Sequence, residues 1–322
     1  MSWPGSLLAL SSGNAALVPG AENVKATEVQ LGWSTYRAPR DEGTWPIDRC
    51  RGKQRANMFI SRKAYTAAKT VYYPAFRAFL YVRSAIHCAI EVVSGSRYTR
   101  VPPPLLRYKV SESFDIRLFL IEGQRIAETI ERALNDAGES LSRMNTVLDF
   151  GCGCGRTTRW LIENFPSTRF CGTDVDTHAI NWCRQHLHGS FCVNRPAPPL
   201  DFGDGEFDCI CAISVFTHLD EQQQLQWLTE FRRILKPGGL LLVSLHGAGA
   251  IDNLSAQDMM ALRSQGILFK RSPKLGGLHP EFYHTTFQTK EYVLRIWPVI
   301  FEIVSYKELG LGYQDLVVLR RS

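Results

Sequence analysis

The sequence has no apolar segment long enough to cross a bilayer and no pair of cysteines spaced C-x-x-C. A membrane span needs about 18 or more apolar residues without charge, and structural zinc sites usually include such cysteine pairs, so neither is predicted. The nine cysteines are an odd number and fall mostly in expected strands, which is typical of small core residues rather than of a disulfide framework. We therefore expect no metal site and a reducing, cytoplasmic location.

The sequence also lacks the G-x-G-x-x-G spacing that places pyrophosphate at a helix N-terminus in dinucleotide-binding folds. Its segment VLDFGCGCG instead places three glycines at alternate positions after a short apolar strand. Without a Cβ, Gly151, Gly153 and Gly155 can form a turn that lets a ligand lie against the backbone; the alternative for each is a tight turn without a ligand. Asp149 beside this turn would repel pyrophosphate but pair with an amino group. The pattern favours S-adenosylmethionine, which carries an ammonium and no phosphate.

Polar side chains follow three further expected strands. The segment FCGTDVD ends the second strand, and Asp174 is expected there to bind the ribose hydroxyls of the cofactor. Asp176 either contributes to the same ribose site or caps the helix that follows. Asn194 follows the third strand. Ser214 ends the fourth, FDCICAIS, whose near-continuous apolar character is typical of a strand buried on both faces of a parallel sheet.

Four segments in this order, DFGCGCG, GTDVD, FDCICAISVFTHL and LKPGGLLLVSLHG, resemble the motifs of class I S-adenosylmethionine-dependent methyltransferases. The resemblance covers about residues 113–320. It implies an α/β, Rossmann-like, doubly wound fold with a seven-stranded sheet that ends in an antiparallel hairpin. It also implies that the glycines and Asp149 hold the methionine end of the cofactor and Asp174 the ribose. Many relatives carry an acid where this chain has Asn194, whose oxygen can accept the same hydrogen bond from the adenine amino group. A Pro-rich segment at residues 101–107 resembles a bacterial subgroup of the family.

Composition divides the chain into three parts. Residues 1–55 are rich in Gly, Pro, Ser and Arg and are expected to form an irregular or disordered basic arm. Residues 56–110 are expected to form basic helices divided at Pro74, followed by an extended Pro-rich linker. Residues 111–322 are expected to form the methyltransferase domain. The positive charge is concentrated in the extension, because residues 1–110 contain 16 Lys and Arg against 6 Asp and Glu.

The helical segment 57–93 has two interpretations. It packs on the domain or on a protein partner, or it makes peripheral contact with an anionic membrane surface, as basic amphipathic helices do. The sequence carries no signal for the oligomeric state.

Residues 247–288 exceed the usual connection after the fifth strand and are expected to form an insertion on the substrate side. Methyl transfer to a hydroxyl is helped by a general base, and histidine is suited to that role near neutral pH. His246, directly after the fifth strand, is the first candidate. His284 and Tyr283 in the insertion are further candidates for catalysis or for orienting the acceptor. The alternative for each is a hydrogen-bonded structural residue, and for His218 we favour the structural interpretation.

The sequence therefore predicts an S-adenosylmethionine-dependent methyltransferase that methylates an oxygen, or alternatively a nitrogen, of a small molecule or glycan. A nucleic-acid methyltransferase is one alternative, motivated by the basic extension. Nucleic acid is not the expected partner, because the loop after the fourth strand lacks the Asp/Asn-Pro-Pro-aromatic signature of base amino methylation. The other alternative is a non-catalytic, cofactor-binding scaffold whose basic extension recruits a partner or an anionic surface.

Overall fold

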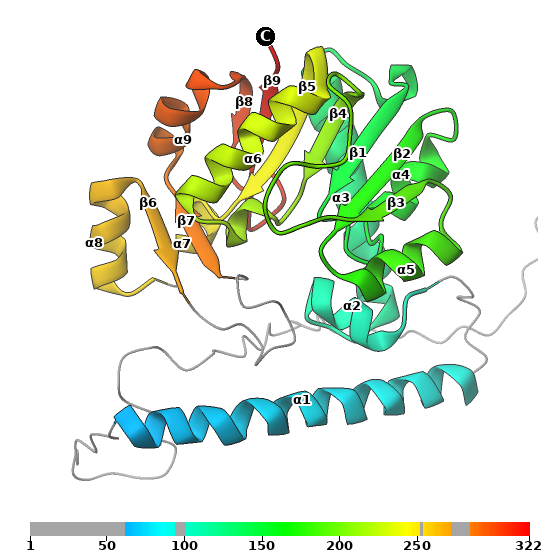
Figure 1. Ribbon diagram of the computed structural model, residues 1–322, viewed down its shortest axis with the longest axis vertical. Helices are drawn as coiled ribbons and strands as arrows, with labels where there is room; N and C mark the ends of the chain where they lie inside the picture. Colours follow the sequence, from blue (N-terminus) through cyan, green and yellow to red (C-terminus); the bar gives the residue numbers. More distant parts are fainter. Residues whose placement is uncertain (1–61, 94–100, 252–253, 272–283) are drawn as a thin grey trace, which may run out of the picture. The chain divides into compact units, whose positions relative to one another are not determined.

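A seven-stranded sheet is the centre of the computed structural model, which describes residues 62–93, 101–251, 254–271 and 284–322, with side chains from residue 74 onward (Figure 1). The expectation of an irregular arm at 1–55 lies outside the described residues. The strands are β1 (Thr146–Phe150), β2 (Arg169–Asp174), β3 (Ser190–Val193), β4 (Phe207–Ala212), β5 (Leu235–Leu245), β8 (Glu302–Lys307) and β9 (Asp315–Arg320). Their order is β3-β2-β1-β4-β5-β9-β8.

The first five strands of that order are parallel, and β9 runs antiparallel to both β5 and β8. The expected doubly wound sheet with a terminal antiparallel hairpin is therefore confirmed. All five residues of β1 are buried, as expected for a central parallel strand covered on both faces.

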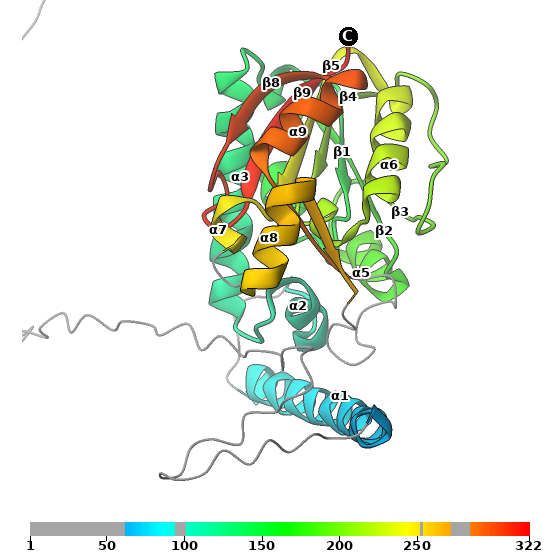
Figure 2. The same ribbon diagram turned by 90° about the vertical axis from the view of Figure 1, so that its left-hand side faces the viewer.

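Side chains of alternate strand residues enter two separate hydrophobic clusters, one on each face of the sheet. Val147 and Cys209 pack with α3 (Ile116–Asp136) and α4 (Thr158–Asn164). Their neighbours in sequence, Leu148 and Ile210, pack with α6 (Glu221–Ile234) and α9 (Lys290–Ile296). Figure 2 shows α3 on one side of the sheet and α6 on the other. A third cluster joins α5 (Thr177–His186) to β3 and α3. The sheet is thus covered on both faces.

Short polar side chains start most of the helices of the described residues. Asp115 begins α3 and Asp176 begins α5, each accepting backbone N–H groups of the first turn. Asp220 and Gln223 form a capping box at the start of α6. Thr289 caps α9 by accepting the backbone N–H of Tyr292.

One prediction made from a proline was wrong. Pro74 does not divide the basic segment, because α1 runs as one helix through it, Arg62–Val93. The linker was expected at residues 94–104; residues 94–100 lie outside the described residues, 101–103 are not helical, and Pro104 is the first residue of α2 (Pro104–Ser111). Proline is favoured at that position because the first helical N–H has no partner within the helix and the fixed φ is already helical. Among the described residues, no helix combines the length and apolarity needed to cross a membrane.

The insertion at 247–288 contains α7 (Ala248–Ile251), α8 (Ala256–Gln265) and a two-stranded antiparallel ribbon. The ribbon strands are β6 (Ile267–Lys270) and β7 (Thr285–Gln288), and neither was predicted. A bridge between His246 and Phe287 attaches β7 to the residue that follows β5. The insertion is therefore anchored at the carboxyl end of the parallel strands.

Arg107 of α2 connects α1, α2 and the start of α3. Its side chain is fully buried, and its guanidinium pairs with the Glu91 carboxylate of α1. It also donates to the carbonyl oxygens of Pro102 and Phe114, the latter at 2.9 Å from Nη2. The Arg107 guanidinium thus pairs with acceptor groups from three segments: α1, the residues before α2 and the residues before α3.

We predict that Arg107→Ala lowers the free energy of unfolding by about 3 kcal/mol, because it leaves buried carbonyls and a carboxylate without their donor. Urea unfolding followed by circular dichroism measures the change. Arg117→Ala, at an exposed position of α3, is the control and should change the same quantity by less than about 0.5 kcal/mol. Equal effects of the two substitutions would contradict the role given to Arg107.

Candidate cofactor site

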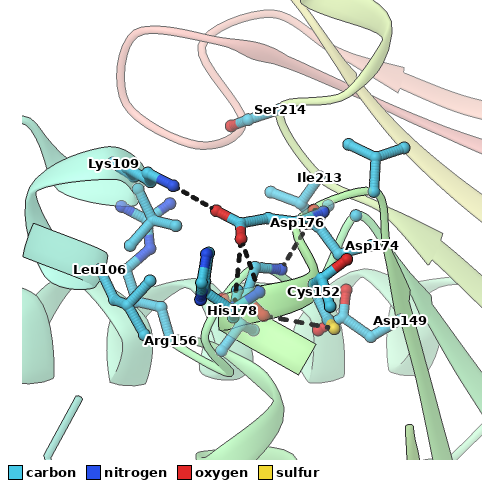
Figure 3. Close-up of a pocket in the computed structure, with 17 residues that line it drawn as sticks. Leu106, Lys109, Asp149, Cys152, Arg156, Asp174, Asp176, His178, Ile213 and Ser214 are labelled. Carbon is cyan, nitrogen blue, oxygen red and sulfur yellow. Dashed lines mark hydrogen bonds and ion pairs between the residues drawn. The ribbon is translucent and has the colours of Figure 1, made fainter. Parts of the chain in front are cut away.

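A cavity of about 470 Å³ lies where β1, β2 and β4 end. Figure 3 shows its lining, which comes from the glycine turn, the start of α5, the loop after β4 and the inner side of α2. Six of the predicted cofactor residues meet here: Asp149, Gly151, Gly153, Asp174, Asp176 and Ser214. The carboxyl ends of parallel strands are where open α/β folds bind ligands. The sequence therefore placed the cavity correctly.

The glycine turn is folded against the end of β2 by backbone hydrogen bonds. Gly151, Gly153 and Gly155 have φ values of 76°, 53° and 73°, a region that residues with a Cβ rarely adopt. The N–H groups of Gly151 and Cys152 donate to the Thr173 carbonyl at 2.8 and 3.0 Å. The turn expected from the alternate glycines is thus present.

The three glycines differ in what they approach. Gly151 and Gly153 line the cavity, and a Cβ on Gly153 would lie 2.7 Å from a methyl group of Val110 in α2. Gly155 is not part of the lining, and a Cβ there would meet Leu187 after α5 at 2.4 Å. In the structure Gly155 allows close packing of the turn on α5, and its predicted contact with a cofactor has no support from this geometry.

Asp149 is the buried acid of the site. Its side chain is 5% exposed and accepts a hydrogen bond from the Thr158 hydroxyl. Burial raises the pKa of Asp149 to about 6, the nearby Asp174 carboxylate adds to the rise, and Thr158 and Arg156 act against it. A cation beside Asp149 would favour its ionised form, so this carboxyl is suited to receive an ammonium group.

Asp174 holds the turn and the start of α5 together. Its two carboxylate oxygens accept the backbone N–H groups of Gly153 and Asp176, each at 2.8 Å. Burial raises the pKa of Asp174, and the two backbone donors oppose that rise. Each carboxylate oxygen has a second lone pair, so these bonds leave Asp174 able to accept from a ligand as well.

Asp176 is confirmed as the helix cap, because one of its carboxylate oxygens accepts the N–H groups of His178 and Ala179. The other oxygen pairs with Lys109 Nζ of α2 at 2.6 Å, as Figure 3 shows. Burial acts to raise the pKa of Asp176, but the Lys109 ammonium and the helix N–H groups outweigh it and lower the pKa. Its alternative role toward the ribose stays a prediction.

A second, smaller cavity of about 110 Å³ shares Gly151, Asp174 and Ser214 with the first. Asn194 lines it, and its side-chain oxygen is buried without a hydrogen-bond partner, while its amide nitrogen donates to the Arg195 carbonyl. Unpaired buried acceptors are rare in native proteins, so this oxygen is suited to a ligand that presents an N–H donor. The exocyclic amino group of adenine is such a donor.

Of the candidate histidines, the structure brings His218 to the smaller cavity, where the sequence favoured a structural role. Its Nδ1 lies 2.7 Å from the carbonyl oxygen of His284. His246 is not in the lining of either of these two cavities, and its ring centroid lies 6.4 Å from that of His218. The Nδ1 of His284 is buried with no hydrogen-bond partner. Tyr283 lies outside the described residues.

Sequence reasoning missed two cations of the cavity, Arg156 and Lys109. Arg156 directly follows the last glycine of the turn, and its Nη1 lies 3.3 Å from the Glu122 carboxylate of α3. Because Arg156 directly follows the glycine motif, its place in the cavity could have been predicted from the sequence. Lys109 was not detectable, because its approach depends on α2 being a helix rather than a linker.

Residues 147–239 match the model of a family described as methyltransferase domain. Over 98 residues the chain is 34% identical to a fatty-acid O-methyltransferase of Mycolicibacterium smegmatis, covering 30% of this chain and 35% of that protein. It is 31% identical to a trans-aconitate 2-methyltransferase of Azoarcus sp., covering 38% and 47%. The chain thus spans less than half the length of these curated relatives.

A methyltransferase solved from Burkholderia thailandensis with 1,6-didemethyltoxoflavin and S-adenosylhomocysteine bound has a TM-score of 0.45 and 17% identity, covering 69% of this chain and 92% of that one. The family match spans the glycine turn, β2 and β4, and the sheet has the expected strand order. Residues 147–239 therefore match a methyltransferase domain, within a sheet that has the strand order expected for that fold.

We predict that Asp149→Asn stabilises the cofactor-free protein near pH 7 and weakens cofactor binding. A carboxyl whose pKa rises from 3.8 to about 6 on folding stabilises the fold below pH 3.8 and loses that contribution as the pH passes 6. The shift corresponds to about 3 kcal/mol, an upper limit to the gain in unfolding free energy. Urea unfolding from pH 4 to 8 should show the gain growing with pH. The exposed Asp136→Asn is the control, and an equal gain at pH 4 and pH 8 would contradict the assignment.

We predict that Gly153→Ala reduces cofactor affinity at least about tenfold, because its Cβ would displace Val110 and α2 over the cavity. Gly138→Ala is the matched control, since Gly138 has φ 81° and no atom within 4 Å of its Cβ position. Both should cost about 1 kcal/mol of backbone strain. Calorimetric titration with S-adenosylhomocysteine measures the affinity of both variants, and only Gly153→Ala should bind more weakly. Unchanged affinity in Gly153→Ala would remove Gly153 from the site.

Proposed function

We propose that the protein is an S-adenosylmethionine-dependent methyltransferase acting on an oxygen, or alternatively a nitrogen, of a small molecule or glycan. The observation that carries this proposal is the joined pair of cavities with three carboxylates, a positive-φ glycine turn and an unpaired amide oxygen. These groups are complementary to a ligand with an ammonium, a cis-diol and an aromatic amino group. A pyrophosphate beside Asp149, Asp174 and Asp176 would instead be repelled.

Each part of the cofactor has a counterpart in this chain. Asp149 is assigned to the ammonium of the methionine end, and Arg156 to its carboxylate. Asp174 accepts from the ribose hydroxyls, and the Asn194 oxygen accepts from the adenine amino group. The backbone of Gly151 and Gly153 lies against the ligand because no Cβ intervenes.

When bound, the cofactor supplies an electrophilic methyl group, so the protein chiefly has to position an acceptor in line with it and exclude water. Ser214 borders both cavities and has φ 60°. Its N–H donates to the Ser244 hydroxyl at 2.6 Å, and its own hydroxyl donates to Gln314 at 3.1 Å. The fixed loop after β4 is therefore suited to position an acceptor beside the methyl group. Leu106 and Val110 of α2 contribute an apolar cover.

For a hydroxyl acceptor, we assign the general base to the pair His218 and His246. A carbonyl oxygen only accepts hydrogen bonds, so the Nδ1 of each ring carries the proton: His218 donates to the His284 carbonyl and His246 to that of Thr286. This leaves Nε2 as the basic nitrogen in the neutral form. His284 and Tyr283 are retained as candidates for orienting the acceptor.

The relatives also favour a second acceptor class within the same chemistry. Fatty-acid O-methyltransferase and trans-aconitate 2-methyltransferase are both named for carboxylic acids. A carboxylate is already a nucleophile and needs no general base. Turnover of a hydroxyl acceptor should therefore depend on a histidine base, whereas turnover of a carboxylate acceptor should not.

The two alternatives have less support. The loop Ile213-Ser214-Val215-Phe216 lacks the signature of base amino methylation, which argues against a nucleic-acid acceptor. A scaffold that binds cofactor without turnover would show saturable binding but no product with any acceptor. The cytoplasmic location stays a prediction from cysteine usage.

We predict that the full chain forms S-adenosylhomocysteine with at least one member of a panel of phenols, sugars and carboxylic acids. With a hydroxyl acceptor, His218→Ala or His246→Ala should lower kcat by roughly 10²–10⁴-fold, whereas with a carboxylate the change should be only a few-fold. His186→Ala is the control, because its ring stacks on Trp182 at the exposed end of α5. Turnover of a hydroxyl acceptor that neither substitution affects would exclude the assigned base, and cofactor binding without turnover on any acceptor would favour the scaffold.

A further inference from the structure

Helix α1 carries two apolar stripes that face in different directions. The inner stripe is centred on Leu80, which is 2% exposed, and continues along the helix at steps of three or four residues to His87 and Glu91. The outer stripe consists of Phe79, Val82, Ile86, Ile90 and Val93, spaced 3, 4, 4 and 3 residues apart. At about 100° per residue, the centres of the two stripes are roughly 120° apart around the helix.

The inner stripe is already occupied by the domain. Leu80 packs with Phe114, which precedes α3, and with Tyr108 of α2. His87 stacks on Phe114 with ring centroids 5.0 Å apart, and Glu91 pairs with the buried Arg107. These contacts fix the rotation of α1 about its axis, so the direction of the outer stripe is also determined.

Within the part of the chain that the structure describes, no side chain packs over the outer stripe in this way. Each of its five residues is more than half exposed, and Val93 is 87% exposed. Single exposed apolar residues are common, but a continuous stripe along a helix marks an interaction surface. The helix would otherwise expose this apolar surface to water.

The net charge of α1 indicates which kind of surface the outer stripe contacts. Helix α1 contains Arg62, Lys63, Lys69, Arg77 and Arg83 but only one acid, Glu91, so its net charge is +4. Glu91 is committed to Arg107 within the domain. A second copy of α1 would bring another +4 to the same surface, and residues 1–61 carry 7 Lys and Arg against 5 Asp and Glu. The positive charge of α1 repels both a second copy of α1 and residues 1–61, whereas it attracts an anionic surface.

We propose that the outer stripe of α1 docks on an anionic lipid bilayer, with the five apolar side chains entering the headgroup boundary, Arg83 beside them contacting lipid phosphates and the net positive charge of the helix attracting the surface. The helix lies on the surface and does not cross it. Because Arg107 ties α1 to α2, and α2 lines the cofactor cavity, docking places the covered side of that cavity next to the membrane. This proposal does not depend on methyl transfer.

Flotation of the full chain with vesicles tests the proposal. Phosphatidylcholine vesicles containing phosphatidylglycerol should bind the protein, and vesicles of phosphatidylcholine alone should bind it at least about tenfold more weakly. The double substitution Ile86→Ser, Ile90→Ser should reduce binding to anionic vesicles at least about tenfold. Arg83→Gln should reduce it about fivefold, because Arg83 lies roughly 60° from the centre of the outer stripe and one basic residue near such a surface contributes on the order of a factor of five.

Val299→Ser is the matched control, because Val299 is also 87% exposed but belongs to a turn after α9. It should leave vesicle binding unchanged, and all variants should bind S-adenosylhomocysteine like the parent, which shows that they are folded. Absence of binding to anionic vesicles would overturn the proposal. So would a concentration-dependent dimer in analytical ultracentrifugation that the double substitution abolishes, because the occupant would then be a second copy.

Discussion

The attachment of the glycine turn to the end of β2 is the constraint on which the rest of the site depends. Three backbone N–H groups of the turn, those of Gly151, Cys152 and Gly153, are satisfied by the Thr173 carbonyl and the Asp174 carboxylate. Glycine adopts the positive φ values of this turn much more readily than residues that carry a Cβ. The same carboxylate accepts the N–H of Asp176 before α5. One acid therefore fixes the turn, the helix start and the floor of the cavity together.

The opposite wall of the cavity depends on a second set of contacts, which involves the N-terminal helices. Lys109 pairs with Asp176, and Val110 lies over Gly153. Helix α2 is in turn held by Arg107, whose partners come from α1 and from the segment before α3. The basic extension is thus not independent of the methyltransferase domain. A partner of α1 is therefore connected, through the Glu91–Arg107 pair and α2, to the wall of the cofactor cavity.

Burial of carboxyl groups distinguishes this site from an ordinary surface cavity. Asp149 is held in a position where its ionised form is unfavourable without a cation, as its raised pKa shows. Such a group costs stability and is therefore expected where a ligand compensates for it. The unpaired oxygen of Asn194 has the same character. Both groups are satisfied by a ligand with an ammonium at one end and an amino group at the other.

Much of the sheet and the cofactor cavity could be predicted from the sequence, because buried parallel strands have continuous apolar runs and helix starts carry Asp or Thr. Asp149, Gly151, Gly153 and Asp174 were placed correctly for that reason.

Features set by contacts between distant segments could not be predicted. The β6 and β7 ribbon has short strands, and a separate bridge connects β7 to His246. Lys109 reaches the cavity only because α2 is folded against it. His218 was given a structural role because it lies in a turn that leads into a helix; its position at the smaller cavity and its contact with the distant His284 carbonyl appear only in the folded structure.

Pro74 gave a misleading local signal in this chain. It was expected to divide a helix, yet it lies inside α1, whereas Pro104, at the end of the expected linker, begins α2. The position of a proline within a helix decides its effect, and that position is set by the residues around it.

The central claim is that this chain binds S-adenosylmethionine through the joined cavities. Isothermal titration calorimetry of the full chain with S-adenosylmethionine, S-adenosylhomocysteine and NAD tests it most directly. We expect saturable one-site binding of the first two compounds and no binding of NAD. Binding of NAD, or no binding of either S-adenosyl compound, would contradict it.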